Sequence, residues 1–145
     1  MYTEQMTQAN AILARLDPVS QGTGTTTPMT DIDISKYRRL MFILQIGAVG
    51  AAGTVDAKLR ESKTSGGAYQ DFTTSIAITQ VTAANKVVTI EVRNDQMDAT
   101  YQFVQLSLTI GGNAVLVGGV CLGGEAVQKP GKANDIAAVT QRLVA

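Results

Sequence analysis

Apolar and polar residues alternate along much of the chain between Val87 and Leu122. Every second side chain is apolar in Val88–Arg93, and the alternation recurs in Tyr101–Ile110. A period of two is typical of a β-strand with one face on a core. The turn-rich stretch Asn94–Thr100 between these segments predicts an antiparallel pair. Polar side chains are spread along the strands rather than gathered into a catalytic set, which favours a scaffolding or binding role.

Further strands are predicted on both sides of this pair. The segment Tyr37–Ile46 is apolar on both faces because Met41 and Ile43 interleave with the apolar residues of the other face, so we expect both faces to be covered. Shorter segments that alternate or are rich in valine complete the set: Val55–Arg60, Tyr69–Phe72, Ile76–Val81 and Ala114–Leu122. About eight short strands with hardly a helix predict an all-β fold, a jelly-roll-like antiparallel β-sandwich.

Residues 1–32 are expected to form an N-terminal arm outside this sandwich. The segment Ala11–Leu16 fits one helical turn or a short strand, and we favour a strand or an extended arm. The Gly/Thr-rich stretch Gln21–Pro28 that follows is typical of a loop or connector. The apolar residues Ile12, Leu13 and Leu16 are therefore predicted to anchor the arm on a neighbouring chain.

Residues 33–124 are assigned to the sandwich core and residues 125–145 to a C-terminal tail. The spacing of Ile136, Val139 and Leu143 fits a helix, and an extended arm fits equally well. We expect this tail to pack on the core or on a neighbour.

Composition limits the chemistry that the chain can perform. At 145 residues it suits one domain, and 12 basic residues balance 12 acidic residues, so no net charge attracts nucleic acid or an acidic membrane surface. The absence of histidine excludes a Ser-His-Asp triad and a histidine-ligated zinc site. Cys121 is the only cysteine and is expected to be a buried small hydrophobe. No apolar run reaches the ~20 residues of a membrane span, and the N-terminus lacks a signal-peptide pattern, so we expect synthesis in the cytoplasm.

Four short motifs are compatible with ligand binding, and each is better explained by ordinary structure. Asp31 and Asp33, with Ser35, lack the spacing of a calcium loop. Asp95 and Asp98 resemble a carboxylate pair but fit turn chemistry. The remaining two are the glycine series Gly47, Gly50 and Gly53, which lacks the phosphate-loop spacing, and the basic cluster Lys36, Arg38 and Arg39, which fits a solvated strand start. No cofactor or metal is expected.

The order of several segments resembles small structural proteins of tailed bacteriophages. The resemblance covers about residues 33–145, and residues 1–32 match less well. It is carried by Asp33–Leu40, Val55–Ser62 with Tyr69–Phe72, Val87–Arg93, Tyr101–Thr109, Val117–Val120, Lys129–Pro130 and Asn134–Ile136.

The resemblance implies a capsid cement or decoration protein, which is not an enzyme. Such proteins are β-sandwich homo-oligomers on the outer face of the head, where they tie major capsid subunits together. The implied partners are the major capsid protein and the chain itself, as a dimer or trimer, with no nucleic acid and no membrane. Under this reading, Ile12, Leu13 and Leu16 are the expected capsid-contact residues.

Two other classes of function stay open. A carbohydrate-binding module shares the sandwich, although the chain has no tryptophan and few aromatic residues for stacking on sugars. A carboxylate hydrolase needs paired acids in a cleft, and the turn with Asp95 and Asp98 is the candidate.

Overall fold

A computed structural model describes residues 5–127, 135–141 and 143. More than half of the described residues lie in strands, and the other elements among them are one short α-helix and two single-turn 3-10 helices. In chain order the elements are α1 (Met6–Ala9), β1 (Ala11–Gln21), β2 (Gly24–Asp33), η1 (Ile34–Lys36), β3 (Tyr37–Val49), β4 (Thr54–Ser62), β5 (Gln70–Asp71), β6 (Lys86–Arg93), η2 (Asn94–Gln96), β7 (Phe103–Gly111) and β8 (Val115–Ala126).

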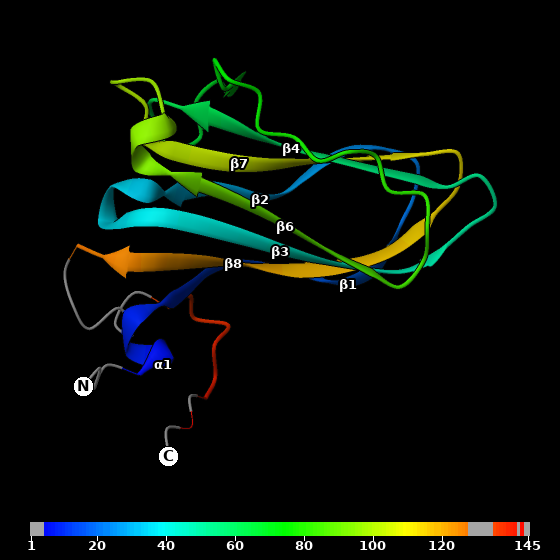
Figure 1. Ribbon diagram of the computed structural model, residues 1–145, viewed down its shortest axis with the longest axis horizontal. Helices are drawn as coiled ribbons and strands as arrows, with labels where there is room; N and C mark the ends of the chain where they lie inside the picture. The colour runs from blue at the N-terminus through cyan, green and yellow to red at the C-terminus, as the bar shows by residue number, and fades with distance from the viewer. Residues whose placement is uncertain (1–4, 128–134, 142, 144–145) are drawn as a thin grey trace.

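The strands form two antiparallel four-stranded sheets packed face to face (Figure 1). Sheet A has the order β1-β8-β3-β6, and sheet B has the order β2-β7-β4-β5. Consecutive strands along the chain thus alternate between the sheets for most of its length, which is the connectivity of an eight-stranded jelly roll. The all-β jelly-roll-like sandwich predicted from the alternation is confirmed.

The core lies between the sheets and is filled by alternate residues of each long strand. In β3, Leu40, Phe42 and Leu44 are fully buried, and they face the buried Leu106 and Leu108 of β7 in the other sheet's layer. The remaining core residues are branched aliphatic for the most part, as expected for pleated surfaces packed on each other.

Within the predicted arm at residues 1–32, residues 11–32 do not lie outside the sandwich, because they form two of its strands. The strand β1 pairs with β8 from Ala11 to Gln21, with two irregularities in register, and β2 pairs with β7. The connector predicted at Gln21–Pro28 is only the short turn between β1 and β2. The threonines that follow the turn belong to β2, because threonine is favoured in strands. The domain boundary at residue 32 is therefore wrong.

β8 is rich in glycine, and the missing side chain at Gly123 leaves room for side chains of neighbouring segments. At Gly123 a Cβ atom would lie 2.7 Å from side-chain atoms of both Leu13 and Tyr37, which is closer than packed atoms approach. Both of these side chains pack toward the core at this point. The close approach of β1 to β8 thus depends on the missing side chain.

Two of the predicted strands are shorter than expected. The segment Tyr69–Phe72 contains only β5, and Ile76–Val81 contacts β4 through isolated bridges at Ala77 and Val81 instead of forming a regular strand. Backbone amides of Val55 and Leu59 donate to Val81 and Ile76 carbonyl oxygens, at 2.8 Å in each case. The segment therefore covers the edge of β4 without presenting an open edge of its own.

The C-terminal segment returns to the start of β1. The amide of Ile136 donates to the Ile12 carbonyl oxygen at 2.9 Å, and the Asp135 carboxylate accepts from the Ile12 amide at 2.8 Å. Residues 135–141 contain neither a helix nor a strand, and they include a turn in which the Val139 amide donates to the Ile136 carbonyl oxygen at 3.0 Å. The part of the predicted tail at 128–134 lies outside the described residues.

Candidate functional site

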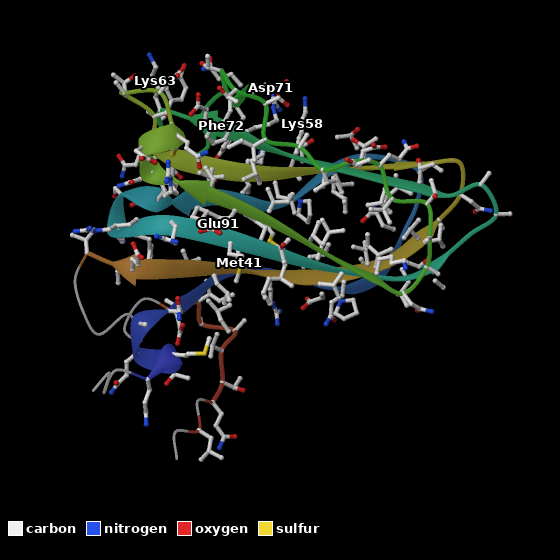
Figure 2. The ribbon with its side chains drawn as sticks, in the orientation of Figure 1. Met41, Lys58, Lys63, Asp71, Phe72 and Glu91 are labelled. Carbon is white, nitrogen blue, oxygen red and sulfur yellow. The ribbon has the colours of Figure 1, made fainter. Side chains whose placement is uncertain are left out.

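The outer face of sheet A is apolar along its middle, and it is the strongest candidate for a functional surface. Met41 on β3 pairs with Leu122 on β8, which pairs with Ile12 on β1. One row further along, Ile43 pairs with Val120. We call these five residues the sheet-A patch; all are half-buried on the outer face of the sheet. Figure 2 shows Met41 and Glu91 on this sheet, away from Lys58 and Asp71 on the opposite sheet.

The outer face of sheet B has the opposite character. Ser107 and Gln105 of β7 are buried there, and the Gln105 amide donates to the Thr30 hydroxyl at 3.1 Å. Lys58 forms a 2.8 Å ion pair with Asp71 across the same face. An apolar outer face is therefore found on sheet A and not on sheet B.

A small apolar hollow of about 240 Å³ lies at one end of the sheet-A patch. It is bounded by α1, by the outer side of β1 and β8, and by residues of the C-terminal segment. Its apolar lining comes from Met6, Ile12, Leu122 and Val139. Because Met6 is 81% exposed, an apolar side chain also projects into solvent beside the hollow. In Figure 1, α1 and residues 135–141 lie beyond β8 and β1, outside the sandwich.

The three predicted contact residues do not share one surface. Leu13 and Leu16 pack against the molecule's own core, so they do not form the expected anchor for a neighbour. Ile12 lies on the outer face and belongs to the sheet-A patch. Ile12 and Leu13 lie on opposite faces because side chains alternate along a strand. The register shift between Ile12 and Ala14 then places Leu16 on the inner face as well, and no sequence pattern marks that irregularity.

A pair of carboxyl groups meets at the end of sheet B, where β4 ends. Glu61 is fully buried, and its carboxylate accepts from the Asp98 amide at 3.2 Å and from the Gln70 side-chain amide at 3.3 Å. The Asp98 carboxylate accepts from the same Gln70 amide at 3.3 Å and from the Thr73 hydroxyl at 3.0 Å. Burial raises the pKa of Glu61, and the facing Asp98 carboxyl raises it further, while the hydrogen bonds from Asp98 and Gln70 offset only part of the effect.

Asp95 and Asp98, for which turn chemistry was preferred over a carboxylate pair, are not paired with each other: the Asp95 carboxylate contacts the Arg93 guanidinium at 3.1 Å. The partner of Asp98 is Glu61, which the sequence analysis did not single out. The sequence signal that pointed to Glu61 was the pair of polar residues Glu61 and Ser62 at the end of an alternating strand. The structure buries both side chains.

The Asp31 and Asp33 carboxylates are held by protein donors. Asp31 accepts from the Gly66 amide and the Tyr69 hydroxyl, both at 2.7 Å, and these bonds lower the pKa of Asp31. At Asp33 burial opposes ionisation, but bonds from Ser35 and Gln102 outweigh it and lower the pKa of Asp33. These carboxylates therefore fix loops, and no group of three or more possible metal-ligating residues occurs within the described residues.

The other motifs have structural roles. Gly50 and Gly53 belong to the tight turn between β3 and β4, where a Cβ atom at either position would lie 2.8 Å from a neighbouring side chain, and a strand follows instead of a helix. Arg39 pairs with Glu91 at 3.4 Å and Glu125 at 2.9 Å, so this part of the basic cluster is neutralised. Cys121 is buried, and burial raises the pKa of its thiol. In the described part of the chain no helix is both long and apolar enough to span a membrane.

Comparison with known proteins supports the fold. No family model and no curated protein sequence matches this chain. Among solved structures, the chain is similar to one from "Structure of infectious bursal disease virus Gt strain", with a TM-score of 0.53 and 12% sequence identity. The similarity covers 85% of this chain and 33% of that chain, so this chain spans about a third of that chain's length. At this identity the likeness shows a shared fold, one found in a virus structure; the resemblance to tailed-phage proteins stays a prediction.

Proposed function

We propose that the protein is a structural component of a virus particle, a cement or decoration protein on the outer face of a bacteriophage head. The observation that carries the proposal is the jelly-roll connectivity, which a chain from a virus structure shares over most of the present chain. The resemblance of residues 33–145 to small phage structural proteins supports the same role. In it, the protein binds the major capsid protein and works without chemical turnover.

The physical requirements of this role match the molecule. A cement protein adds buried area at junctions between capsid subunits, and by binding only the assembled shell it stabilises that shell by mass action. A sandwich with a fully buried core is suited to transmit load, and many copies on one lattice allow each contact to be modest.

The carbohydrate-binding alternative gains no support from the arrangement of aromatic residues. Phe72 is buried, Tyr69 is bonded to Asp31, and Tyr101 lies against Lys63 with 5.1 Å between the ammonium nitrogen and the ring centre. No aromatic side chain is fully exposed in the part of the chain that the structure describes. A flat stacking platform for sugars is therefore not found there.

The decisive experiment mixes the purified protein with heads that lack it. Binding is measured by co-sedimentation, and cryo-electron microscopy of the decorated heads locates the added density. The proposal expects saturable binding and a β-sandwich-sized density on the outer surface. Heads that neither bind the protein nor gain density, at concentrations where the protein is folded, would overturn it. Asp95→Asn serves as a matched control that removes an exposed carboxylate and is expected to bind like the wild type.

A further inference from the structure

We propose that the outer face of sheet A is the contact between two copies of this chain, packed face to face about a two-fold axis that runs along the strands. The inference deepens the proposed function by assigning the surface for self-association. It is carried by the sheet-A patch, by the asymmetric cover over that patch, and by the charges at its rim.

The apolar character of the patch calls for a partner. Ile12, Met41, Ile43, Val120 and Leu122 form adjoining rows across three strands, and further apolar side chains border them, with Val87 63% exposed and Leu116 43% exposed. Contiguous apolar surface of this kind on a protein marks an interaction site. The outer face of sheet B shows no such rows, so the proposal concerns one face only.

The cover on the patch is confined to one half of the sheet. The helix α1 and residues 135–141 lie against β1 and β8, and they bound the hollow that Ile12 and Leu122 line. The half formed by β3 and β6 carries Met41, Ile43 and Val87, and among the described residues no backbone hydrogen bond joins it to α1 or to residues 135–141. A two-fold axis along the strands places β1 of one copy over β6 of the other, so the covered half of each copy meets the uncovered half of its partner. The exposed Met6 of each copy then lies over Met41 and Glu91 of the other.

The rim charges favour this arrangement over repulsion between like copies. The β-ladder register aligns Arg15 with Val120, Ile43 and Thr89 across the four strands, with Glu91 two residues further along β6. Within each copy Arg15 pairs with Asp17 at 3.3 Å and Glu91 pairs with Arg39 at 3.4 Å. When β1 lies over β6, Arg15 approaches the row between Thr89 and Glu91 of the second copy, so each of these charges keeps its own partner and gains a second one of opposite sign. The chain has 12 basic and 12 acidic residues, so no overall field opposes the approach.

The size of the face sets the strength of the contact. Four strands about 4.8 Å apart, with the eight paired residues of β3 and β6 rising about 3.4 Å each, give a flat area of roughly 500 Å². A standard stable interface buries about 800 Å² on each partner. The flat face alone is thus too small, so the proposed contact also includes α1 and residues 135–141. We therefore expect self-association in the micromolar range.

The first test measures the free protein by sedimentation velocity across the micromolar range, without heads. The wild type is expected to shift from monomer to dimer, and Ile43→Lys to weaken association by about tenfold or more. Thr79→Lys, which adds the same charge on the sheet-B side, is the control and is expected to associate like the wild type. Circular dichroism establishes that each variant is folded.

The second test uses a double cysteine variant, Arg15→Cys with Thr89→Cys. Within one chain these positions are separated by three strand spacings, about 14 Å, which is too far for the roughly 6 Å between Cα atoms in a disulfide. In the proposed dimer they face each other across the two-fold axis. Mild oxidation is expected to produce a covalent dimer from the double variant and little from either single variant, while the buried Cys121 stays unreacted.

Three results would overturn the inference: a wild type that stays monomeric throughout the range, a folded Ile43→Lys variant that associates like the wild type, or single variants that cross-link as well as the double variant. Because these measurements use no heads, their failure leaves head binding untouched. A dimer that does not bind heads would instead contradict the proposed function alone.

Discussion

Glu61 is the one charged residue among the described residues whose side chain is completely shielded from solvent. Its hydrogen-bond donors are an amide of the main chain and an amide side chain, and its nearest titratable neighbour is another acid, Asp98. Around this end of the sandwich, Arg60 and Lys58 are engaged with Asp71, and Lys63 lies over Tyr101. The ionised carboxylate therefore lacks a bonded cation, and this sets the pH dependence expected of the fold.

We expect Glu61→Gln to stabilise the protein at neutral pH. Because the pKa of Glu61 is raised in the folded state, its favourable contribution is complete below the ordinary value of 4.5 and is lost as the pH rises through the folded-state pKa. A glutamine keeps the acceptor for the Asp98 amide, and its own amide can donate to the Asp98 carboxylate. Urea unfolding at acidic and neutral pH measures the difference between variant and wild type, which is expected to grow as the pH rises.

The control for this prediction is Glu91→Gln, which removes the same charge from an exposed side chain and weakens its contact with Arg39. It is expected to bring no gain in stability at neutral pH. A Glu61→Gln variant that is less stable than the wild type at neutral pH would show that the ionised carboxylate is required.

Truncation of a core leucine is expected to have a large cost. Leu106 of β7 is fully buried, and it pairs with Leu59 and Met29, which are buried as well. Leu106→Ala is expected to lower the free energy of unfolding by about 2–5 kcal/mol, from lost burial and the remaining cavity. Asp95→Asn, at an exposed ion pair, is expected to stay within about 0.5 kcal/mol of the wild type. Denaturant melts check both values, and equal costs would contradict the assigned core.

At the scale of elements, β1 and α1 are adjacent in the chain and make unequal contributions to the fold. β1 is an edge strand of sheet A that pairs with β8 along its length and contributes the buried Ala11. By contrast, α1 contains no buried residue and is held by local hydrogen bonds, including those from Gln8 and Asn10 to the preceding turn. We therefore expect the residues before about residue 10 to be dispensable for folding and those of β1 to be essential for it.

Two deletions test this expectation. Removal of residues 1–9 is expected to change the melting temperature little, because few core contacts are lost, while it weakens self-association by removing Met6 and one wall of the hollow. Removal of residues 1–20 takes away nearly all of β1, so cooperative unfolding is expected to be lost. Thermal melts followed by circular dichroism compare the two, and a cooperative melt after the longer deletion would show that β1 is peripheral.

At the scale of the whole molecule, the outer face of sheet B is polar, and the outer face of sheet A is apolar along its middle. In the proposed function, we expect self-association to use sheet A and contact with the shell to use the rest of the surface. Because a ligand that binds only the assembled shell stabilises it by mass action, the effect must depend on protein concentration.

Heads supplied with the purified protein are expected to resist heat better than bare heads, with a melting temperature that rises with protein concentration until the sites are filled. Calorimetry or release of packaged DNA measures the change. The Ile43→Lys variant is expected to require a higher concentration for the same protection, because each bound copy loses its neighbour's contact. Protection that is independent of the added concentration would contradict the mass-action basis.

The sequence by itself determined the class of fold and most of the strand positions. In a strand, successive side chains point to opposite faces of the sheet, so a strand with one face on the core has an apolar residue at every second position, as in Val88–Arg93. This pattern does not depend on which strands are neighbours in the sheet. The same local rule predicted that Met41 and Ile43 lie on a second apolar face. For the same reason it identified Cys121 as a buried small hydrophobe.

Only the tertiary structure decided which strands pair and which side chains meet. The Gly/Thr-rich stretch at residues 21–28 looked like a connector, yet pairing with β7 supplies the backbone hydrogen bonds that make most of it a strand. The register shift in β1 after Ile12 placed Leu16 on the same inner face as Leu13, whereas unbroken alternation would have placed it on the outer face with Ile12. Glu61 and Asp98, 37 residues apart, meet because β4 and the turn before β7 end at the same edge of sheet B. Such contacts depend on chain topology. Local residue patterns do not show which segments, far apart in sequence, lie close together in space.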